Sequence, residues 1–213
     1  MIFFRHPAIT ATKSRGENKD KSMRTPVVGI IILVLALAVV ILIWQRDKKD
    51  VAVQSIEATM QEIKVTSSAF QHNGMIPEKF TCDGEDMSPP LEISGVPQGM
   101  KSLALIMHDP NAPREGGWTH WVKFNMKMNN ELGIMNIEEG EEPEGVAGKG
   151  TGGNLVYMGP CPPSGAHRYV WSAYALDTKL SLKEGSTKTE LESIMQGHIL
   201  AKGELIGLYS RTK

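Results

Sequence analysis

Residues 27–43 form an uninterrupted apolar segment, and no other feature of the chain restricts its possible folds so strongly. A helix of this length extends about 25 Å, which with interfacial residues is enough to cross a bilayer core of about 30 Å. A helix buried in a soluble protein is rarely apolar on every face over such a length. Pro26 suits the first turn of a helix, and Trp44 with the cations behind it suits a membrane interface. We therefore predict a transmembrane helix at residues 25–45.

The sequence around this segment favours an uncleaved anchor with a defined orientation. A cleaved signal peptide has a shorter apolar region and a small-residue cleavage site, which the residues after position 43 lack. Six Lys or Arg residues precede the segment and three follow it closely, so the positive-inside rule places the N-terminus in the cytoplasm. We predict a single-pass membrane protein with a basic, disordered cytoplasmic tail at residues 1–24, a polar tether at residues 46–61 and a C-terminal domain outside the cytoplasm.

Residues 62–213 have the alternation of apolar and polar side chains that is typical of strands. Residues 102–107 form a short apolar run that indicates a buried strand, whereas residues 118–126 and 168–177 alternate. Only residues 188–198 have apolar side chains spaced for one face of a soluble helix. Many short strands with one or two helices predict a mainly β fold, a Greek-key β-sandwich with few short helices.

The charge and cysteine content of this domain argue against two classes of protein. Residues 62–213 carry 14 basic and 19 acidic side chains, and an acidic surface repels a nucleic-acid backbone. Any anion must therefore be held by local groups rather than by the overall field. Cys82 and Cys161 are too few for a disulfide-rich scaffold and lack zinc-site spacing. They are either two semi-buried free thiols or one disulfide in an extracytoplasmic domain.

Polar residues gather at the expected ends of strands, where loops bring distant residues together. Asp109 follows the apolar run described above, and the prolines after it end that strand. His120 shares one face of the next strand with Trp118 and Val122, so it is expected to point inward. His167 opens a later strand, immediately after a proline-rich loop. Three tryptophans are expected in the core: Trp118, Trp121 and Trp171.

Several short motifs occur in a specific order between residues 67 and 211. They are CDG…SPPL (82–91), DPNAP (109–113), WTHW (118–121), GPCPPSG…HRY (159–169), YALD (174–177) and GHILAKGELIGLYSR (197–211). Together they resemble the phosphatidylethanolamine-binding protein family, in its bacterial and archaeal Raf-kinase-inhibitor-like branch. The resemblance implies a large β-sandwich with a shallow anion pocket, in agreement with the strand pattern.

The resemblance also implies which residues form this pocket: Asp109 of DPNAP, His120 of WTHW, Pro163 of the proline-rich loop, and His167 and Tyr169 of HRY. Two imidazoles can donate hydrogen bonds to phosphate oxygens, more strongly when protonated, and Asp109 can orient one of them. Pro163 would keep its loop rigid, and Tyr169 would add a hydroxyl. Backbone N–H groups of the Gly/Pro loop supply further donors.

Two positions depart from the family pattern, and the resemblance also implies where the two cysteines lie. Asn111 stands where the family usually has a second Asp, which removes one negative charge near the site. Ile93 stands where a Trp is common, so one wall of the fold or pocket is expected to differ. The resemblance places Cys82 and Cys161 in loops near the pocket rim, where they would pair if the domain is outside the cytosol.

These features predict a membrane-anchored binding protein rather than an enzyme, with an anion pocket for phosphate-bearing ligands and no cofactor. The ligand would be a phosphorylated small molecule, a phospholipid headgroup or a phosphorylated side chain. The resemblance adds a protein kinase or a protease as a partner, with inhibition as the role. Two alternatives stay open: a metal-dependent hydrolase that uses Asp109, His120 and His167, and a structural adaptor with a vestigial pocket. The sequence lacks the HExxH and GxSxG motifs of common hydrolases.

Overall fold

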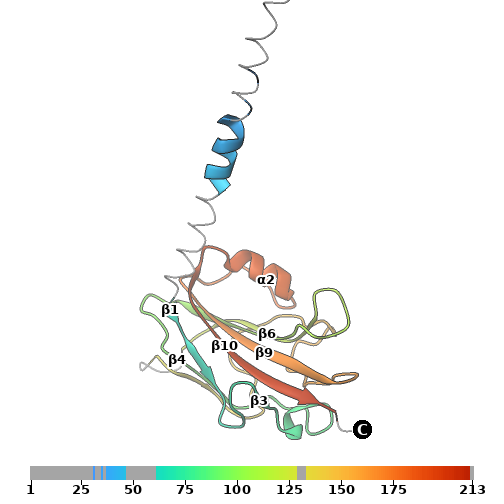
Figure 1. Cartoon of the computed structure of the whole chain (residues 1–213). Helices are drawn as coiled ribbons and strands as arrows, with labels where there is room; N and C mark the ends of the chain where they lie inside the picture. The colour runs from blue at the N-terminus through green and yellow to red at the C-terminus, as the bar shows by residue number, and fades with distance from the viewer. Residues whose placement is uncertain (1–30, 32–34, 36, 47–60, 129–132, 212–213) are drawn as a thin grey trace, which may run out of the picture. The chain divides into compact units, whose positions relative to one another are not determined.

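The computed structural model describes residues 31, 35, 37–46, 61–128 and 133–211 of the chain (Figure 1). The chain divides into two units, Met1–Glu57 and Ala58–Lys213. Within the first unit, residues 37–46 are helical and their side chains are exposed.

Most of the predicted N-terminal organisation lies outside the described residues. This applies to the tail at residues 1–24, to much of the span at residues 25–45 and to nearly all of the tether at residues 46–61. Within the described part of the chain, no helix is long and apolar enough to cross a membrane. The membrane anchor therefore stays a prediction.

The second unit is built mainly from strands with few helices, as the sequence predicts. Its strands are β1 (Gln61–Glu62), β2 (Lys64–Thr66), β3 (Gly74–Met75), β4 (Leu91–Ser94), β5 (Ser102–Asp109), β6 (Trp118–Met126), β7 (Met135–Ile137), β8 (Val146–Ala147), β9 (Ala166–Leu176) and β10 (Ile199–Ser210). Its helical segments are the 3-10 helix η1 (Glu78–Phe80) and the α-helix α2 (Lys188–Met195). The strands β5, β6 and β9 correspond to the three strands that the hydrophobic pattern indicates.

The strands form two hydrogen-bonded sheets. In the larger sheet the order is β1-β10-β9-β5-β6-β8, and β3 also pairs with β10. The smaller sheet has the order β2-β4-β7. In the larger sheet β5 lies antiparallel to both β6 and β9. The last residues of β5 therefore lie beside the first residues of β6 and β9, which brings three motif-bearing strand ends to one edge of the sheet.

Two separate apolar cores cover the two faces of the larger sheet. One core contains residues from both sheets, among them Ile93, Trp121 and Trp171. The other core packs the opposite face against α2 through Leu191 and Met195, and Figure 1 shows α2 lying alongside the larger sheet. Because both faces are covered, β5 is apolar along most of its length rather than alternating. The Greek-key connections of the predicted sandwich stay a prediction.

Helix α2 begins with a capping box. The Thr187 hydroxyl accepts a hydrogen bond from the N–H of Glu190, and a carboxylate oxygen of Glu190 accepts one from the N–H of Thr187 at 2.7 Å. This reciprocal pair satisfies two N–H groups that have no intrahelical partner. The helix ends at Met195, earlier than the predicted residue 198. Gly197, with φ of 81°, then takes the left-handed conformation that favours glycine after a helix.

Replacing Thr187 by alanine is expected to lower the free energy of unfolding by about 1 kcal/mol, because the first turn loses its side-chain acceptor. Urea unfolding followed by circular dichroism measures the change. Thr189, which is exposed in the same helix, provides the matched control. Thr189→Ala should be neutral or slightly stabilising, since alanine has the higher helix propensity. Equal stabilities of the two variants would show that the Thr187 side chain contributes nothing as a cap.

Candidate functional site

A pocket of about 480 Å³ opens where the ends of β5, β6 and β9 meet three loops. Its walls are mostly apolar and include Ala112, Pro113, Trp118, Met158 and Pro163. Its polar side chains are Asp86, Asp109, Arg114, His120 and Tyr169. Four of the five predicted ligand-binding residues therefore line one pocket.

Asp109 ends β5 and ties the loop that follows to the start of β9. One of its carboxylate oxygens accepts a hydrogen bond from the N–H of Asn111 at 2.7 Å, which turns the chain after the strand. The other accepts a hydrogen bond from Nδ1 of His167, also at 2.7 Å. The side-chain oxygen of Asn111 in turn accepts from the N–H of Arg168 at 3.0 Å. The amide at position 111 thus holds the same loop against β9.

His167 is the predicted ligand-binding residue that the structure places outside the pocket wall. Its Nδ1 faces the carboxylate of Asp109, and both side chains are almost completely buried, at 9% exposed for His167 and 4% for Asp109. Its ring is also stacked near Tyr169, with ring centroids 6.4 Å apart. His167 therefore acts on the pocket by holding Asp109 rather than by lining the cavity.

A β-bulge determines where His120 points. Trp121 lies opposite Met107, and Thr119 lies opposite His108, so His120 is an extra residue on β6 with no counterpart on β5. A bulge bends its strand and breaks the strict alternation of side chains between the two faces. This irregularity directs the imidazole into the pocket.

The bulge corrects two expectations from the sequence. Trp118 and His120 both line the pocket, but Val122 belongs to the core that contacts α2, so the three do not share one face. The alternation of side chains along the sequence does not reveal that one extra residue has been inserted in the strand. Trp118 is consequently a wall of the pocket and not a core residue, whereas Trp121 and Trp171 are buried in the core as predicted.

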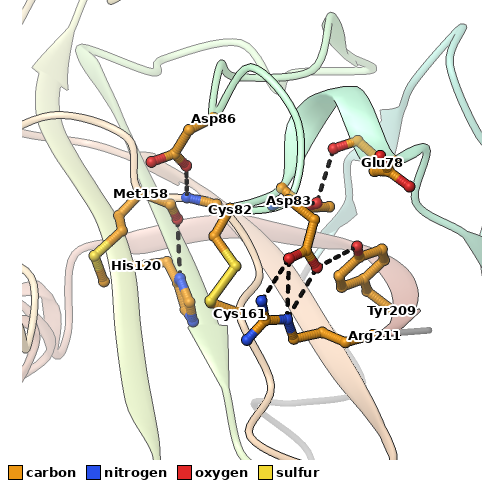
Figure 2. Close-up of a disulfide and its surroundings, with 11 residues drawn as sticks. Glu78, Cys82, Asp83, Asp86, His120, Met158, Cys161, Tyr209 and Arg211 are labelled. Atoms are coloured by element: carbon orange, nitrogen blue, oxygen red, sulfur yellow. Dashed lines mark hydrogen bonds and ion pairs between the residues drawn. A yellow bond between two sulfur atoms is a disulfide. The ribbon is translucent and has the colours of Figure 1, made fainter. Parts of the chain in front are cut away.

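His120 donates a hydrogen bond to the backbone (Figure 2). Its Nδ1 lies 2.9 Å from the carbonyl oxygen of Met158. A carbonyl oxygen can only accept, so Nδ1 carries the hydrogen and, in the neutral ring, Nε2 keeps its lone pair. Burial lowers the pKa of His120, and the Met158 carbonyl and the Asp109 carboxylate offset only part of this effect. Burial therefore favours the uncharged imidazole.

The hydroxyl of Tyr169 is a buried polar group at the pocket, and its hydrogen finds no acceptor among the described residues. The residue is 0% exposed, and its ring packs edge-on against His120 with centroids 5.3 Å apart. Burial, and then the charge of Asp109, raise the pKa of Tyr169, and a hydrogen bond from the N–H of Cys161 opposes them. An unsatisfied buried hydroxyl costs roughly 1–3 kcal/mol. A ligand oxygen beside it would remove that cost.

A disulfide joins the two loops that form one wall of the pocket. Cys82 and Cys161 are bonded, with their Cα atoms 5.4 Å apart, and both line the pocket. Figure 2 shows that Asp83, next to Cys82, accepts hydrogen bonds from the Tyr209 hydroxyl and the Arg211 guanidinium. The Arg211 guanidinium lowers the pKa of Asp83. The loop is therefore held both to the second loop and to the end of β10.

Sequence reasoning missed three residues of this pocket. Asp86 accepts a hydrogen bond from the N–H of Gly159 at 2.6 Å, which pins the two loops together beside the disulfide. The guanidinium of Arg114 lies 5.6 Å from the ring centroid of Trp118. Met158 contributes a carbonyl to His120 and a wall to the pocket. No local sequence pattern marks these three residues as pocket residues, because each is brought to the pocket by the path of its loop.

Metal-binding side chains do not gather in the part of the chain that the structure describes. No group of three or more His, Cys, Asp or Glu residues there is arranged to hold a metal ion. The predicted alternative of a metal site would require Asp109, His120 and His167 to converge. Instead Asp109 and His167 are hydrogen-bonded to each other, while Nδ1 of His120 is bonded to a backbone carbonyl.

A mainly β domain with a small loop-lined pocket is the class of protein that this fold and site define. The family model for phosphatidylethanolamine-binding protein matches residues 66–210. The chain belongs to the phosphatidylethanolamine-binding protein family, and the family inferred from the sequence motifs is thereby confirmed.

Individual relatives show how much of the chain the family covers. A UPF0098 protein of Methanothermobacter thermautotrophicus is 48% identical over 151 residues, which cover 70% of this chain and 99% of that protein. A UPF0098 protein of Archaeoglobus fulgidus is 39% identical over 186 residues, which cover 86% of this chain and 60% of that protein. A crystal structure of a phosphatidylethanolamine-binding protein homologue from Chlamydia trachomatis superposes with a TM-score of 0.65, at 42% identity, over 71% of this chain and 99% of that one.

Proposed function

We propose that this chain is a membrane-anchored binding protein whose pocket takes a phosphate-bearing ligand, either a phosphorylated group or a phospholipid headgroup. The observation that carries the proposal is the Tyr169 hydroxyl, whose hydrogen finds no acceptor among the described residues, beside His120 in a pocket with mostly apolar walls. A phosphate oxygen would accept from the hydroxyl, and the apolar walls would accommodate the rest of a small ligand. Arg114 supplies a positive charge at the same pocket.

Binding without catalysis is part of this proposal. The two cysteines of the pocket are bonded to each other, so neither offers the thiolate that a cysteine nucleophile requires. Among the described residues that line the pocket, none is Ser, Thr or Lys. Both observations argue against a thiol, hydroxymethyl or amine nucleophile of the Cys, Ser, Thr or Lys type in this pocket.

We further propose that the binding domain lies outside the cytoplasm on a membrane tether. Helical residues 37–46 expose apolar side chains such as Leu37, Val40 and Leu42, and an apolar helix surface of this kind needs a non-aqueous cover. The disulfide supports the same location, because such bonds persist in oxidising compartments. In this location a protease is the more accessible partner for an inhibitory role, and a protein kinase is the other partner that the family resemblance implies.

Titration of the full chain with inorganic phosphate or phosphoethanolamine tests the phosphate pocket. The ring NMR signals of His120 should shift with saturation at millimolar ligand or below, and His120→Ala should abolish binding. Tyr169→Phe should weaken binding about tenfold, because the ligand loses one hydrogen bond to a buried donor.

The matched control for this titration is His198, which pairs with Asp177 on the surface. His198→Ala should bind phosphate as the unmodified chain does. The absence of any shift of the His120 signals at millimolar ligand would identify the site as vestigial. Phosphate-dependent shifts of the other histidine rings that persist in His120→Ala would place binding outside this pocket, and either result would contradict the proposal.

A further inference from the structure

His120 presents a hydrogen-bond acceptor, and not a donor, to a ligand. Its Nδ1 is 2.9 Å from the carbonyl oxygen of Met158, which fixes the hydrogen of the neutral ring on that nitrogen. Nε2 is then the nitrogen left for a ligand, and it carries a lone pair. A ligand atom that approaches Nε2 must therefore bring its own hydrogen.

The two carboxylates of the pocket have the same preference. Asp86 already accepts a hydrogen bond from Gly159, and Asp109 accepts one at each oxygen. A carboxylate has no hydrogen to donate, yet it retains further lone pairs that face any group entering the pocket. A fully deprotonated oxyanion therefore meets like charges and lone pairs along this side of the cavity.

The donors of the pocket are fewer and lie among these acceptors. Among the side chains that line the pocket, they include the hydroxyl of Tyr169 and the guanidinium of Arg114. A ligand that matches both sets must accept at one oxygen and donate from another. Among phosphate groups, only one that keeps a P–OH hydrogen can do both.

We propose that the pocket selects phosphomonoesters in their monoanionic form, with the P–OH group donating to Nε2 of His120 while another phosphate oxygen accepts from the Tyr169 hydroxyl. A phosphodiester carries the same single negative charge but has no hydrogen to donate. The inference rests on the proposed phosphate-binding function and narrows its ligand to the monoester class. Phosphodiesters that carry no other hydrogen-bond donor are accordingly disfavoured.

Methyl phosphate and dimethyl phosphate form the sharpest test pair, because their monoanions differ in one hydrogen-bond donor and not in charge. Calorimetric titration of the full chain at about pH 6.5, near the ordinary His pKa, compares them. For methyl phosphate, the dissociation constant is calculated from the concentration of the monoanion alone. On this basis methyl phosphate should bind about tenfold more tightly than dimethyl phosphate, because dimethyl phosphate leaves a buried acceptor unsatisfied.

The pH dependence of the two ligands should also differ. Methyl phosphate loses its monoanion above its second pKa of about 6, so its affinity should fall as the pH rises toward about 8. Dimethyl phosphate does not titrate there, and its affinity should increase only at a pH low enough to protonate His120, whose pKa burial lowers. The titratable and charged groups that surround His120 are Asp109 and His108 of β5, His167 and Tyr169 of β9, and Asp86 and Arg114 of the loops.

Two variants separate the acceptor of the pocket from its donor. In His120→Gln the side-chain amide can turn an N–H toward the ligand, so the preference for the monoester should fall below about threefold. Tyr169→Phe removes a donor that both ligands use, so it should weaken both and leave the preference unchanged. His198→Gln, at the exposed histidine, is the control for a His-to-Gln change outside the pocket.

The outcomes distinguish this inference from the function on which it rests. Equal affinities for methyl phosphate and dimethyl phosphate at about pH 6.5 would overturn the selection of monoesters and leave phosphate binding intact. Failure of both ligands to bind the unmodified chain would remove the proposed function itself. The ring ¹⁵N shifts of His120 give an independent check that needs no variant, because a neutral ring protonated at Nε2 would contradict the inference.

Discussion

Replacing Asp109 by alanine is expected to lower the free energy of unfolding by about 3 kcal/mol. The substitution leaves Nδ1 of His167 and the N–H of Asn111 without their acceptor in a region that is almost completely buried. It also removes the side-chain bond from His167 to the end of β5 and leaves only the Asn111–Arg168 bond between the following loop and β9, so the pocket should lose affinity for phosphate. Urea unfolding of the full chain and the phosphate titration measure the two effects.

A surface pair of the same chemistry provides the control. Asp177 accepts a hydrogen bond from Nδ1 of His198 at 2.8 Å, close to the 2.7 Å of the buried pair, but both side chains are 46% exposed. Asp177→Ala should therefore cost less than about 1 kcal/mol. If the two alanine variants lost equal stability, burial would not be the reason for the contribution of Asp109.

Reduction of the Cys82–Cys161 disulfide is expected to lower the free energy of unfolding by about 4 kcal/mol. The bond joins residues that are 79 positions apart in sequence, and closing a loop of that size removes much of the entropy of the unfolded chain. The reduced protein should remain folded, because Asp86 and Gly159 still connect the same loops and Arg211 still binds Asp83.

Unfolding with and without a dithiol reductant measures this contribution. The double variant Cys82→Ser, Cys161→Ser should match the reduced protein and should not respond to the reductant. A loss of less than about 1 kcal/mol on reduction would mean that the neighbouring hydrogen bonds alone restrict the two loops, contrary to the entropic account.

The fold was predictable wherever a local pattern decides the structure. The apolar run at residues 102–107 became β5 because an internal strand with both faces covered needs apolar residues on both sides. The alternating segment at residues 118–126 has the bounds of β6. The pairing of these strands into two sheets depends on contacts between distant segments, so the sequence pattern could indicate the class of fold but not its register.

The site was predictable to the extent that its residues belong to the recognised motifs. Asp109, His120, Pro163 and Tyr169 all lie in such motifs and all line the pocket. The position of His167 behind Asp109 depends on how β9 lies against β5, which no local pattern contains. Asp86 and Arg114 enter through loops whose paths are set by long-range hydrogen bonds and ring contacts.

The extra residue in β6 has a consequence for how this protein can change over time. A regular ladder between β5 and β6 would add a hydrogen-bonded pair to the sheet, but it would remove the imidazole from the cavity. Selection for a more stable sheet and selection for ligand recognition would therefore act in opposite directions at His120. If the proposed ligand binding were lost, His120 would no longer need to reach the cavity, and we expect that a regular ladder between β5 and β6 would then be tolerated.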